Sequence, residues 1–303
     1  MISWLWIPIT LFAVLMQTVR TAAQKHLTTH LDPVATTLVR FLFGLPFVVL
    51  YLAGIMSWFG VDLPAIQPRF LGLAVFAGVT QIIATVLLIY LFSLRNFAVG
   101  TTYARTEAFL TALLGATLFD EWISAEGWVA IIVSVVGVVV LTVARGGQGQ
   151  HRLLQRLWNR AALVGLGSGF FFALCSLSIR KASLSFGLDN FLLTAGVTLV
   201  TLVVLQTAIM VVYVGFRSNT QLLVMVRQWR VCMLVGLTSA LGSIAWFTAM
   251  TLERAAYVKA LGQIEFLLAL GVSVFFFRER TTPLELAGMF LVGFGILVLV
   301  VAG

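Results

Sequence analysis

The chain contains few charged residues. Only 10% of its 303 residues are Asp, Glu, Lys or Arg, whereas soluble domains carry roughly 25%. Hydrophobic residues make up 61% of the chain, and the mean hydropathy is +1.07. This balance excludes a soluble globular domain, a disordered chain and a coiled coil. It predicts a polytopic membrane protein whose apolar surface faces lipid.

Cysteine, histidine and catalytic motifs are scarce as well. The two cysteines, Cys175 and Cys232, lie in or beside apolar segments, so we expect them to be small packing residues without a disulfide. His26 and His30 have the spacing of metal ligands on a helix, but no third ligand accompanies them. The sequence contains no Walker motif, nucleophile elbow or zinc-protease motif. We therefore predict a protein that is not an enzyme and that uses no cofactor or metal.

The apolar residues form continuous runs of about 20 residues, the length that a membrane-spanning helix requires. Continuous runs favour helices over a transmembrane barrel, in which apolar and polar residues alternate. The runs lie near residues 3–22, 34–54, 70–92, 98–118, 125–144, 161–181, 189–214, 231–252, 256–277 and 284–302. The sequence therefore predicts an all-α integral membrane fold with ten transmembrane helices.

The two halves of the chain resemble each other. A shift of 158 residues aligns TEAFLTALLGATLFDEWIS (106–124) with IEFLLALGVSVFFFRERTT (264–282), and Glu107 then aligns with Glu265. Each half holds five predicted spans, which is an odd number, so the second half must enter the membrane in the opposite sense. The result is an inverted repeat, an architecture that many secondary transporters use.

This symmetry divides the chain into a first five-helix repeat at 1–144, a basic linker at 145–160 and a second five-helix repeat at 161–303. The linker carries arginines at i, i+4 and i+8, a pattern that fits either a short helix on the membrane surface or a solvated connection. The net charge of the chain is +8. In a membrane protein this excess indicates basic loops that face anionic headgroups of the lipid bilayer, and we predict no nucleic-acid partner.

The turns after the fourth and ninth spans carry matched glutamates, Glu121 in FDEWIS and Glu279 in FRERTT. Asp32 and Pro33 open the second span, and Arg40 follows within it. Together with the arrangement of five plus five helices, these features resemble the drug/metabolite transporter superfamily, and specifically its EamA branch, over essentially the whole chain. The resemblance implies a membrane protein that exports or exchanges small metabolites such as amino acids, sugars or drug-like molecules.

Among the charged residues within predicted spans, four are candidates for a functional site: Glu107, Glu265, Arg40 and Arg105. A charge at the centre of a spanning helix costs at least about 2.5–3.5 kcal/mol, so such residues face the bundle interior. They form either a site for substrate or protons, or internal ion pairs that only hold helices together, such as Arg40 with one glutamate. We favour the functional interpretation for the two glutamates, and both interpretations stand for the two arginines.

Two uncharged residues complete the candidate site. Gln263 lies two residues before Glu265, and Tyr103 lies one helical turn before Glu107. Each is therefore expected to line the same cavity as its neighbouring glutamate. Ordinary packing accounts equally well for Tyr103.

These observations predict a secondary-active transporter of the cell inner membrane that moves a small-molecule substrate, with amino acids or related metabolites as the first expectation. The substrate gradient or the proton gradient would drive transport. Glu107 or Glu265 would bind the proton, because burial raises the pKa of a carboxyl group toward physiological pH. A drug or cation exporter is the nearest alternative. A membrane-embedded enzyme or sensor is the alternative from another class, although the sequence contains neither a catalytic constellation nor an output domain.

The loop charges also predict an orientation. The odd-numbered loops carry eleven Lys and Arg residues and the even-numbered loops four, which places the odd-numbered loops in the cytoplasm and both termini outside. The family resemblance implies cytoplasmic termini instead. We favour the orientation that the charge count indicates. The sequence predicts no oligomeric state.

Overall fold

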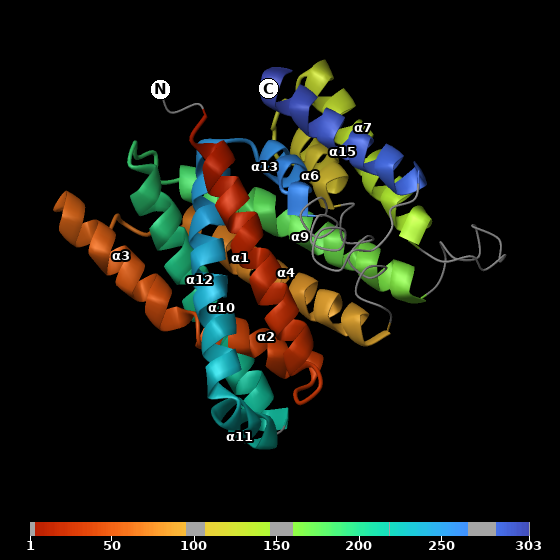
Figure 1. The fold of residues 1–303 in the computed structure, drawn as a ribbon. Coiled ribbons are helices and arrows are strands. Elements are labelled where there is room, and N and C mark those ends of the chain that lie inside the picture. Colours follow the sequence, from red (N-terminus) through yellow and green to blue (C-terminus); the bar gives the residue numbers. More distant parts are fainter. Residues whose placement is uncertain (1–3, 95–106, 146–159, 218, 266–282, 303) are drawn as a thin grey trace.

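The computed structural model describes residues 4–94, 107–145, 160–217, 219–265 and 283–302, and these residues form helices joined by short loops (Figure 1). The helices are α1 (Trp6–Leu27), α2 (Pro33–Leu42), α3 (Leu45–Phe59), α4 (Pro68–Leu94), α6 (Glu107–Leu118), α7 (Ala125–Arg145), α9 (Arg160–Leu184), α10 (Phe191–Arg217), α11 (Asn219–Arg227), α12 (Trp229–Leu252), α13 (Ala255–Leu261) and α15 (Pro283–Ala302). The prediction of an all-helical protein is confirmed.

Six of the described helical segments are long and apolar enough to cross a membrane: α1, α2 with α3, α4, α9, α10 and α12. Shorter apolar helices cover 107–118, 125–137 and 286–298. The predicted spans at 98–118 and 256–277 run partly into 95–106 and 266–282, outside the described residues. The chain is thus a multi-pass membrane protein, and the count of ten spans stays a prediction.

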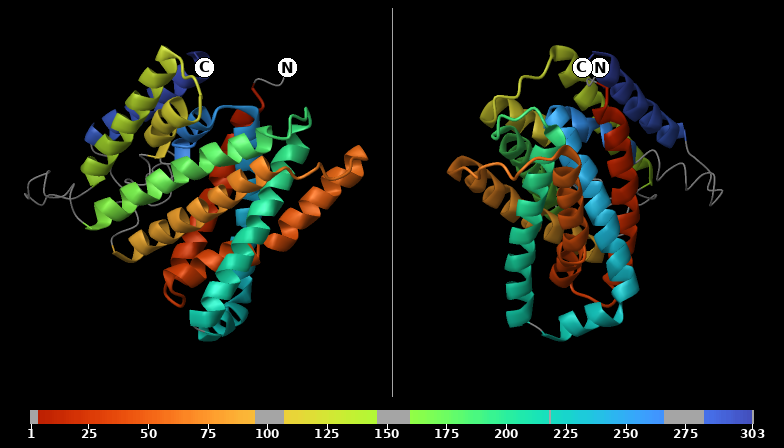
Figure 2. Two further views of the ribbon diagram at one scale, coloured as in Figure 1. Left: turned by 180° about the vertical axis from the view of Figure 1, so that it is seen from behind. Right: turned by 90° about the vertical axis from the view of Figure 1, so that its left-hand side faces the viewer.

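Three pairs of helices form the most extensive contacts in the described structure: α1 with α12, α4 with α9, and α7 with α15. Figure 2 shows the last pair beside the rest of the bundle, which α1, α4, α9, α10 and α12 form. The α2–α3 segment packs against α10. Each of these contacts joins a helix from the first half of the sequence to one from the second half.

Helix starts follow the chemistry that the sequence indicates. Asp32 precedes α2 and its Oδ1 accepts a hydrogen bond from the Ala35 amide at 2.7 Å, while Pro33 occupies the first helical position. Ser124 precedes α7, and its Oγ accepts a hydrogen bond from the Gly127 amide at 3.0 Å. Both are N-caps that satisfy amides without a partner within the helix.

The second predicted span, 34–54, is not one continuous helix. It breaks at Phe43 and Gly44, between α2 and α3. Pro46 explains the break, because proline has no amide hydrogen to bond the carbonyl four residues earlier and its ring clashes with that carbonyl. The break packs tightly against α12, since a Cβ added at Gly236 would lie 2.5 Å from backbone atoms of Phe43.

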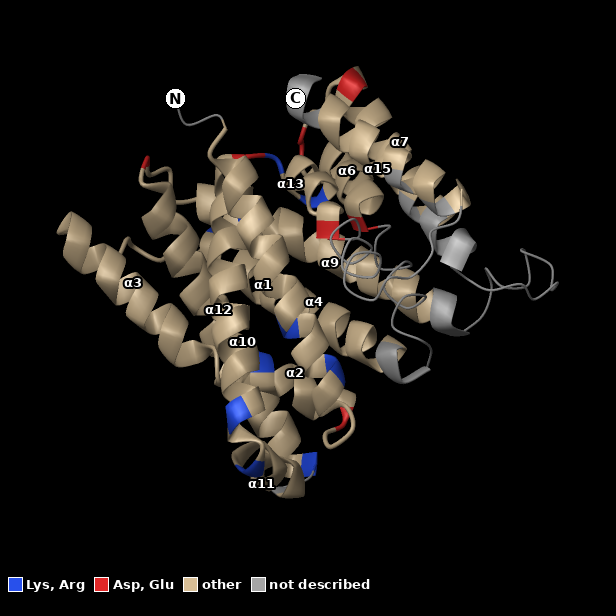
Figure 3. Cartoon of the chain, viewed as in Figure 1, with Lys and Arg blue, Asp and Glu red and all other residues tan. Residues whose placement is uncertain are grey.

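The two ends of the bundle differ in charge. Several basic residues gather around α11, where some of the blue segments of Figure 3 lie. They include Arg217 at the end of α10, Arg227 at the end of α11 and Arg230 at the start of α12. The start of α1 and the end of α15 lie together at the opposite end (Figure 1). The linker at 145–160 lies almost wholly outside the described residues.

Candidate functional site

An ion pair joins the start of α6 to α13 in the bundle interior. The Nζ of Lys259 lies 2.7 Å from Oε1 of Glu107, and the two side chains are 13% and 19% exposed. The Oγ of Ser176, on α9, donates a longer hydrogen bond of 3.4 Å to the same carboxylate oxygen. Glu107 is therefore held by elements from both halves of the chain. Its partner is Lys259 rather than the arginine that internal pairing suggested.

A chain of polar contacts extends from Lys259 to the second candidate glutamate. The Lys259 ammonium lies 4.5 Å from the ring centroid of Trp246, a cation–π contact. The Nε1 of Trp246 donates to Oε1 of Gln17 at 3.1 Å. The Nε2 of Gln17 in turn donates to Oε2 of Glu265, also at 3.1 Å. The structure thus brings Glu107 and Glu265 into one connected polar cluster.

This cluster surrounds a small internal cavity of about 30 Å³. Its lining consists of Gln17, Glu107, Ala108, Trp246, Lys259, Gly262 and Gln263. A cavity of 10–15 Å³ already accommodates a water molecule, so this one has room for water but not for a metabolite. The structure therefore shows this site, called here the Glu107 cavity, in an occluded conformation.

Gln263 is the least satisfied side chain of the Glu107 cavity. It is only 2% exposed, and neither its Nε2 nor its Oε1 has a hydrogen-bond partner among the residues that the structure describes. A buried polar group without a partner costs about 1–3 kcal/mol. A protein retains such a group where it serves another purpose, and an amide at a cavity wall is able to donate to and accept from a bound solute.

Arg40 lies elsewhere. Its guanidinium is buried, and its Nη1 donates to Oγ1 of Thr85 at 3.3 Å. It lines a separate cavity beside the α2–α3 break, not the Glu107 cavity. The two other candidates, Arg105 and Tyr103, lie outside the described residues.

Sequence reasoning missed Lys259 as a site residue. Its signal was present, because a lysine inside the predicted span 256–277 is itself costly and points to function or pairing. Gln17 and Trp246 also line the Glu107 cavity, and sequence reasoning does not place them there. Their position beside Glu265 and Lys259 depends on how α1, α12 and α13 pack.

Residues 4–143 match the model of the EamA-like transporter family. This part of the chain, called here the EamA-like segment, is similar to that family. This family consists of membrane transporters of the drug/metabolite transporter superfamily, not enzymes. Glu107 lies inside the EamA-like segment, whereas Lys259, Gln263 and Glu265 lie beyond it.

The fold itself occurs among solved structures. One crystal structure superposes with a TM-score of 0.72 over 98% of this chain and 99% of its own, at 15% sequence identity. The likeness shows that the overall fold extends beyond the EamA-like segment and across nearly the whole chain. A comparison with curated protein sequences gives no match.

Within the EamA-like segment, the turn between α6 and α7 contacts the second half of the chain. Oε1 of Glu121 lies 3.2 Å from Nε of Arg180. Nη1 of Arg180 also donates to the carbonyls of Met250, at 2.6 Å, and of Glu253, at the end of α12. Burial raises the pKa of Glu121, against the opposing effect of the positive charge of Arg180.

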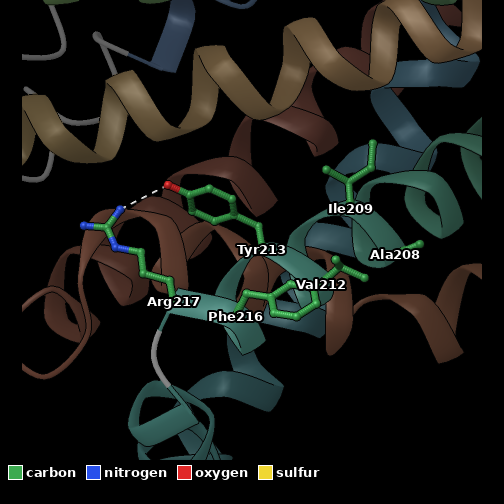
Figure 4. Close-up of a pocket in the computed structure, with 6 residues that line it drawn as sticks. All are labelled: Ala208, Ile209, Val212, Tyr213, Phe216 and Arg217. Carbon is green, nitrogen blue, oxygen red and sulfur yellow. Dashed lines mark hydrogen bonds between the residues drawn. The ribbon is translucent and has the colours of Figure 1, made fainter.

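A cavity of about 740 Å³ lies on the outer face of α10 (Figure 4). Its lining is mainly apolar, and Phe216 is 91% exposed. Nη1 of Arg217 donates a hydrogen bond to the hydroxyl of Tyr213 there, at 3.2 Å. An exposed apolar groove on a spanning helix faces lipid, so we assign it no role in solute recognition.

Proposed function

We propose that this protein is a secondary-active transporter that exports or exchanges small charged metabolites, with amino acids as the first candidates, through the Glu107 cavity. The observation that carries the proposal is a set of three side chains around one cavity inside an apolar bundle: the half-buried carboxylate of Glu107, the half-buried ammonium of Lys259, and the buried amide of Gln263, which has no partner among the described residues. A carboxylate and an ammonium suit a solute that carries both charges, because each pairs with the opposite charge of a zwitterion.

We also propose that the chain consists of two inverted five-helix repeats, 1–144 and 161–303. The helix contacts support this division. If α1 corresponds to α9 and α4 to α12, the contact of α1 with α12 becomes the contact of α9 with α4, and both are present. The contact of α7 with α15 maps onto itself in the same way. Inverted repeats of this kind place the substrate site near the midplane, between the halves.

Proton coupling is part of the proposal, with Glu265 as the proton-binding group. Its Oε2 accepts a hydrogen bond from Gln17, which in turn contacts Trp246 and through it Lys259. Protonation of Glu265 would remove the negative charge that accepts the hydrogen bond from Gln17. The Gln17 side chain would then shift, and with it the Trp246 indole that donates to it. The polar chain thereby offers a physical route from proton binding to the shape of the Glu107 cavity.

A drug or cation exporter is the second candidate, and the charged lining of the Glu107 cavity disfavours it, since hydrophobic cations bind apolar and aromatic surfaces. We place the protein in the cell inner membrane with its α11 end in the cytoplasm, because Arg217, Arg227 and Arg230 gather there. A C-terminal GFP fusion that fluoresces strongly, with an inactive phosphatase fusion, would contradict this orientation.

The proposed function is tested with purified protein in liposomes. Vesicles loaded with an unlabelled mixture of amino acids receive each labelled amino acid in turn, with and without an imposed pH gradient. We expect counterflow of at least one amino acid, and loss of that counterflow in Lys259→Gln. Arg227→Gln is the matched control, because Arg227 is exposed on α11 and distant from the Glu107 cavity in the sequence and in the fold. Absence of counterflow for all amino acids in the wild type contradicts the proposal.

A further inference from the structure

A second polar cavity lies at the break between α2 and α3. Its volume is about 10 Å³, and none of its lining residues belongs to the Glu107 cavity. The polar part of the lining comes from four helices, with Arg40 on α2, Gln81 on α4, Gln206 on α10, and Ser239 and Ser243 on α12. The site is called here the helix-break cavity.

Positive charge dominates the helix-break cavity. Arg40 is 6% exposed, and within the described part of the chain it has no acidic partner within 4.0 Å. Its contacts are the Thr85 hydroxyl and the ring of Phe41, whose centroid lies 5.3 Å from the guanidinium carbon. The positive charge of Arg20, a second buried arginine, acts on Arg40 as well. The negative charge of Glu265 acts on Arg20, whereas no acidic group among the described residues pairs with Arg40. An anion beside Arg40 would therefore stabilise its buried charge.

The backbone adds to this positive potential. The α3 helix has 15 residues and begins at the break, where Gly44 precedes it without a side-chain cap. Gly44 and Val48, from its start, line the helix-break cavity. The first amides of a helix have no partner within the helix and carry a partial positive charge, which favours an anion at that position. Discontinuous helices place such ends beside bound substrates in other transporters.

Two lining side chains have unused hydrogen-bonding capacity. Within the described part of the chain, Ser239 is 3% exposed and its Oγ has no partner. Gln206 is fully buried, and its Nε2 donates to Oε1 of Gln81 at 2.7 Å, but its own Oε1 has no partner among these residues. The Ser239 hydroxyl is therefore free to donate to an anion that Arg40 attracts, while the Gln206 oxygen is free to accept from a hydroxyl or water.

We propose that the helix-break cavity binds the carboxylate group of the transported solute, through Arg40, the Ser239 hydroxyl and the start of α3. This inference rests on the proposed function and specifies its substrate class: solutes must carry a carboxylate. The two cavities adjoin along α12, because Ser243 lines one and Trp246 lines the other, three residues or about 4.5 Å apart along the helix axis. The carboxylate and amino ends of one amino acid are thus able to reach both cavities once they open.

Binding is tested separately from transport. The full-length protein, purified in detergent, is heated at constant ionic strength with leucine, phenylalanine, their decarboxylated amines (isoamylamine and phenethylamine), or their deaminated acids (4-methylpentanoate and 3-phenylpropanoate). We expect at least one amino acid and its deaminated acid to raise the unfolding temperature, and the matching amine to have no such effect. Sodium chloride at the same ionic strength serves as the inorganic-anion arm.

Variants locate the binding. Arg40→Gln should abolish the carboxylate-induced rise, and Arg227→Gln should retain it. If Arg40→Gln does not fold, Ser239→Ala removes only a hydroxyl and should weaken carboxylate binding about tenfold, the effect of one hydrogen bond to a charged group. The inference is overturned if amines or chloride stabilise as well as carboxylates, if no carboxylate stabilises, or if Ser239→Ala binds carboxylates like the wild type. Carboxylate binding without any counterflow in liposomes would support this site and contradict the proposed function alone.

Discussion

The Glu107–Lys259 ion pair offers a quantitative prediction that separates a structural role from a functional one. Glu107→Gln preserves shape but removes the carboxylate that pairs with the Lys259 ammonium, while the cation–π contact with Trp246 remains. Removal of one partner of a buried pair costs 3–5 kcal/mol. Because these side chains retain 19% and 13% exposure, we expect a loss near the lower end, about 3 kcal/mol. Lys259→Gln should cost a similar amount.

The double variant Glu107→Gln/Lys259→Gln decides between the two roles. It contains no unpaired charge at this pair, so its free energy of unfolding should lie within about 1 kcal/mol of the wild type, far from the sum of the two single losses. If the pair serves only stability, this double variant should also transport normally. If the pair binds the solute, the double variant should be stable and inactive.

The assay combines denaturant unfolding in detergent with counterflow in liposomes, for the wild type, both single variants and the double variant. Glu126→Gln, a change of an exposed carboxylate at the start of α7, is the control for loss of an acidic residue. Additive losses of stability would refute the interaction that the structure shows. Recovery of both stability and transport in the double variant would refute the functional role of the pair.

Three further predictions concern the break, the turn and the proton. Gly236→Ala should lower both stability and transport, because a Cβ at this position would lie 2.5 Å from the Phe43 backbone. Gly54→Ala is the control and should be tolerated, because no atom lies within 4 Å of its added Cβ. The unfolding temperatures of the two variants distinguish these outcomes. Arg180→Gln should lose more stability, relative to the wild type, at pH 8 than at pH 5. Burial raises the pKa of Glu121 and the charge of Arg180 opposes that effect, so without Arg180 the ionised carboxylate has no compensating charge at high pH. Equal losses of stability at both pH values would contradict the pairing. Glu265→Gln should insert and fold but lose the dependence of flux on pH between 5.5 and 8, and a pH profile like that of the wild type would exclude Glu265 as the proton site.

The membrane fold was largely predictable because hydropathy alone determines which segments lie in lipid. The predicted spans 161–181 and 231–252 fall within α9 and α12, and the span 189–214 begins two residues before α10 and otherwise lies within it. The break at Phe43 and Gly44 was also signalled, by Pro46 and its neighbouring glycine. Proline within an apolar run is nevertheless a poor indicator by itself, since membrane helices tolerate proline when neighbouring groups satisfy the freed carbonyl.

The candidate site was predictable only in part. Midspan charge identified Glu107, Glu265 and Arg40 as interior residues, because the cost of charge in lipid depends on depth and not on the partner. The partner itself depends on which helices touch. Lys259 meets Glu107 because α13 packs against α6, and no local pattern in the sequence encodes that contact. For the same reason Arg40 could not be assigned in advance to a cavity separate from that of Glu107.

Gln263 provides the most direct test of the central claim that the Glu107 cavity conducts the solute. Gln263→Leu replaces a buried amide without partners by an apolar side chain of similar size, which should leave stability unchanged or raise it by about 1–3 kcal/mol. The measurement is amino-acid counterflow in liposomes containing equal amounts of folded wild type or Gln263→Leu protein. Our account predicts a variant at least as stable as the wild type that no longer transports. A stable variant with undiminished counterflow would contradict it.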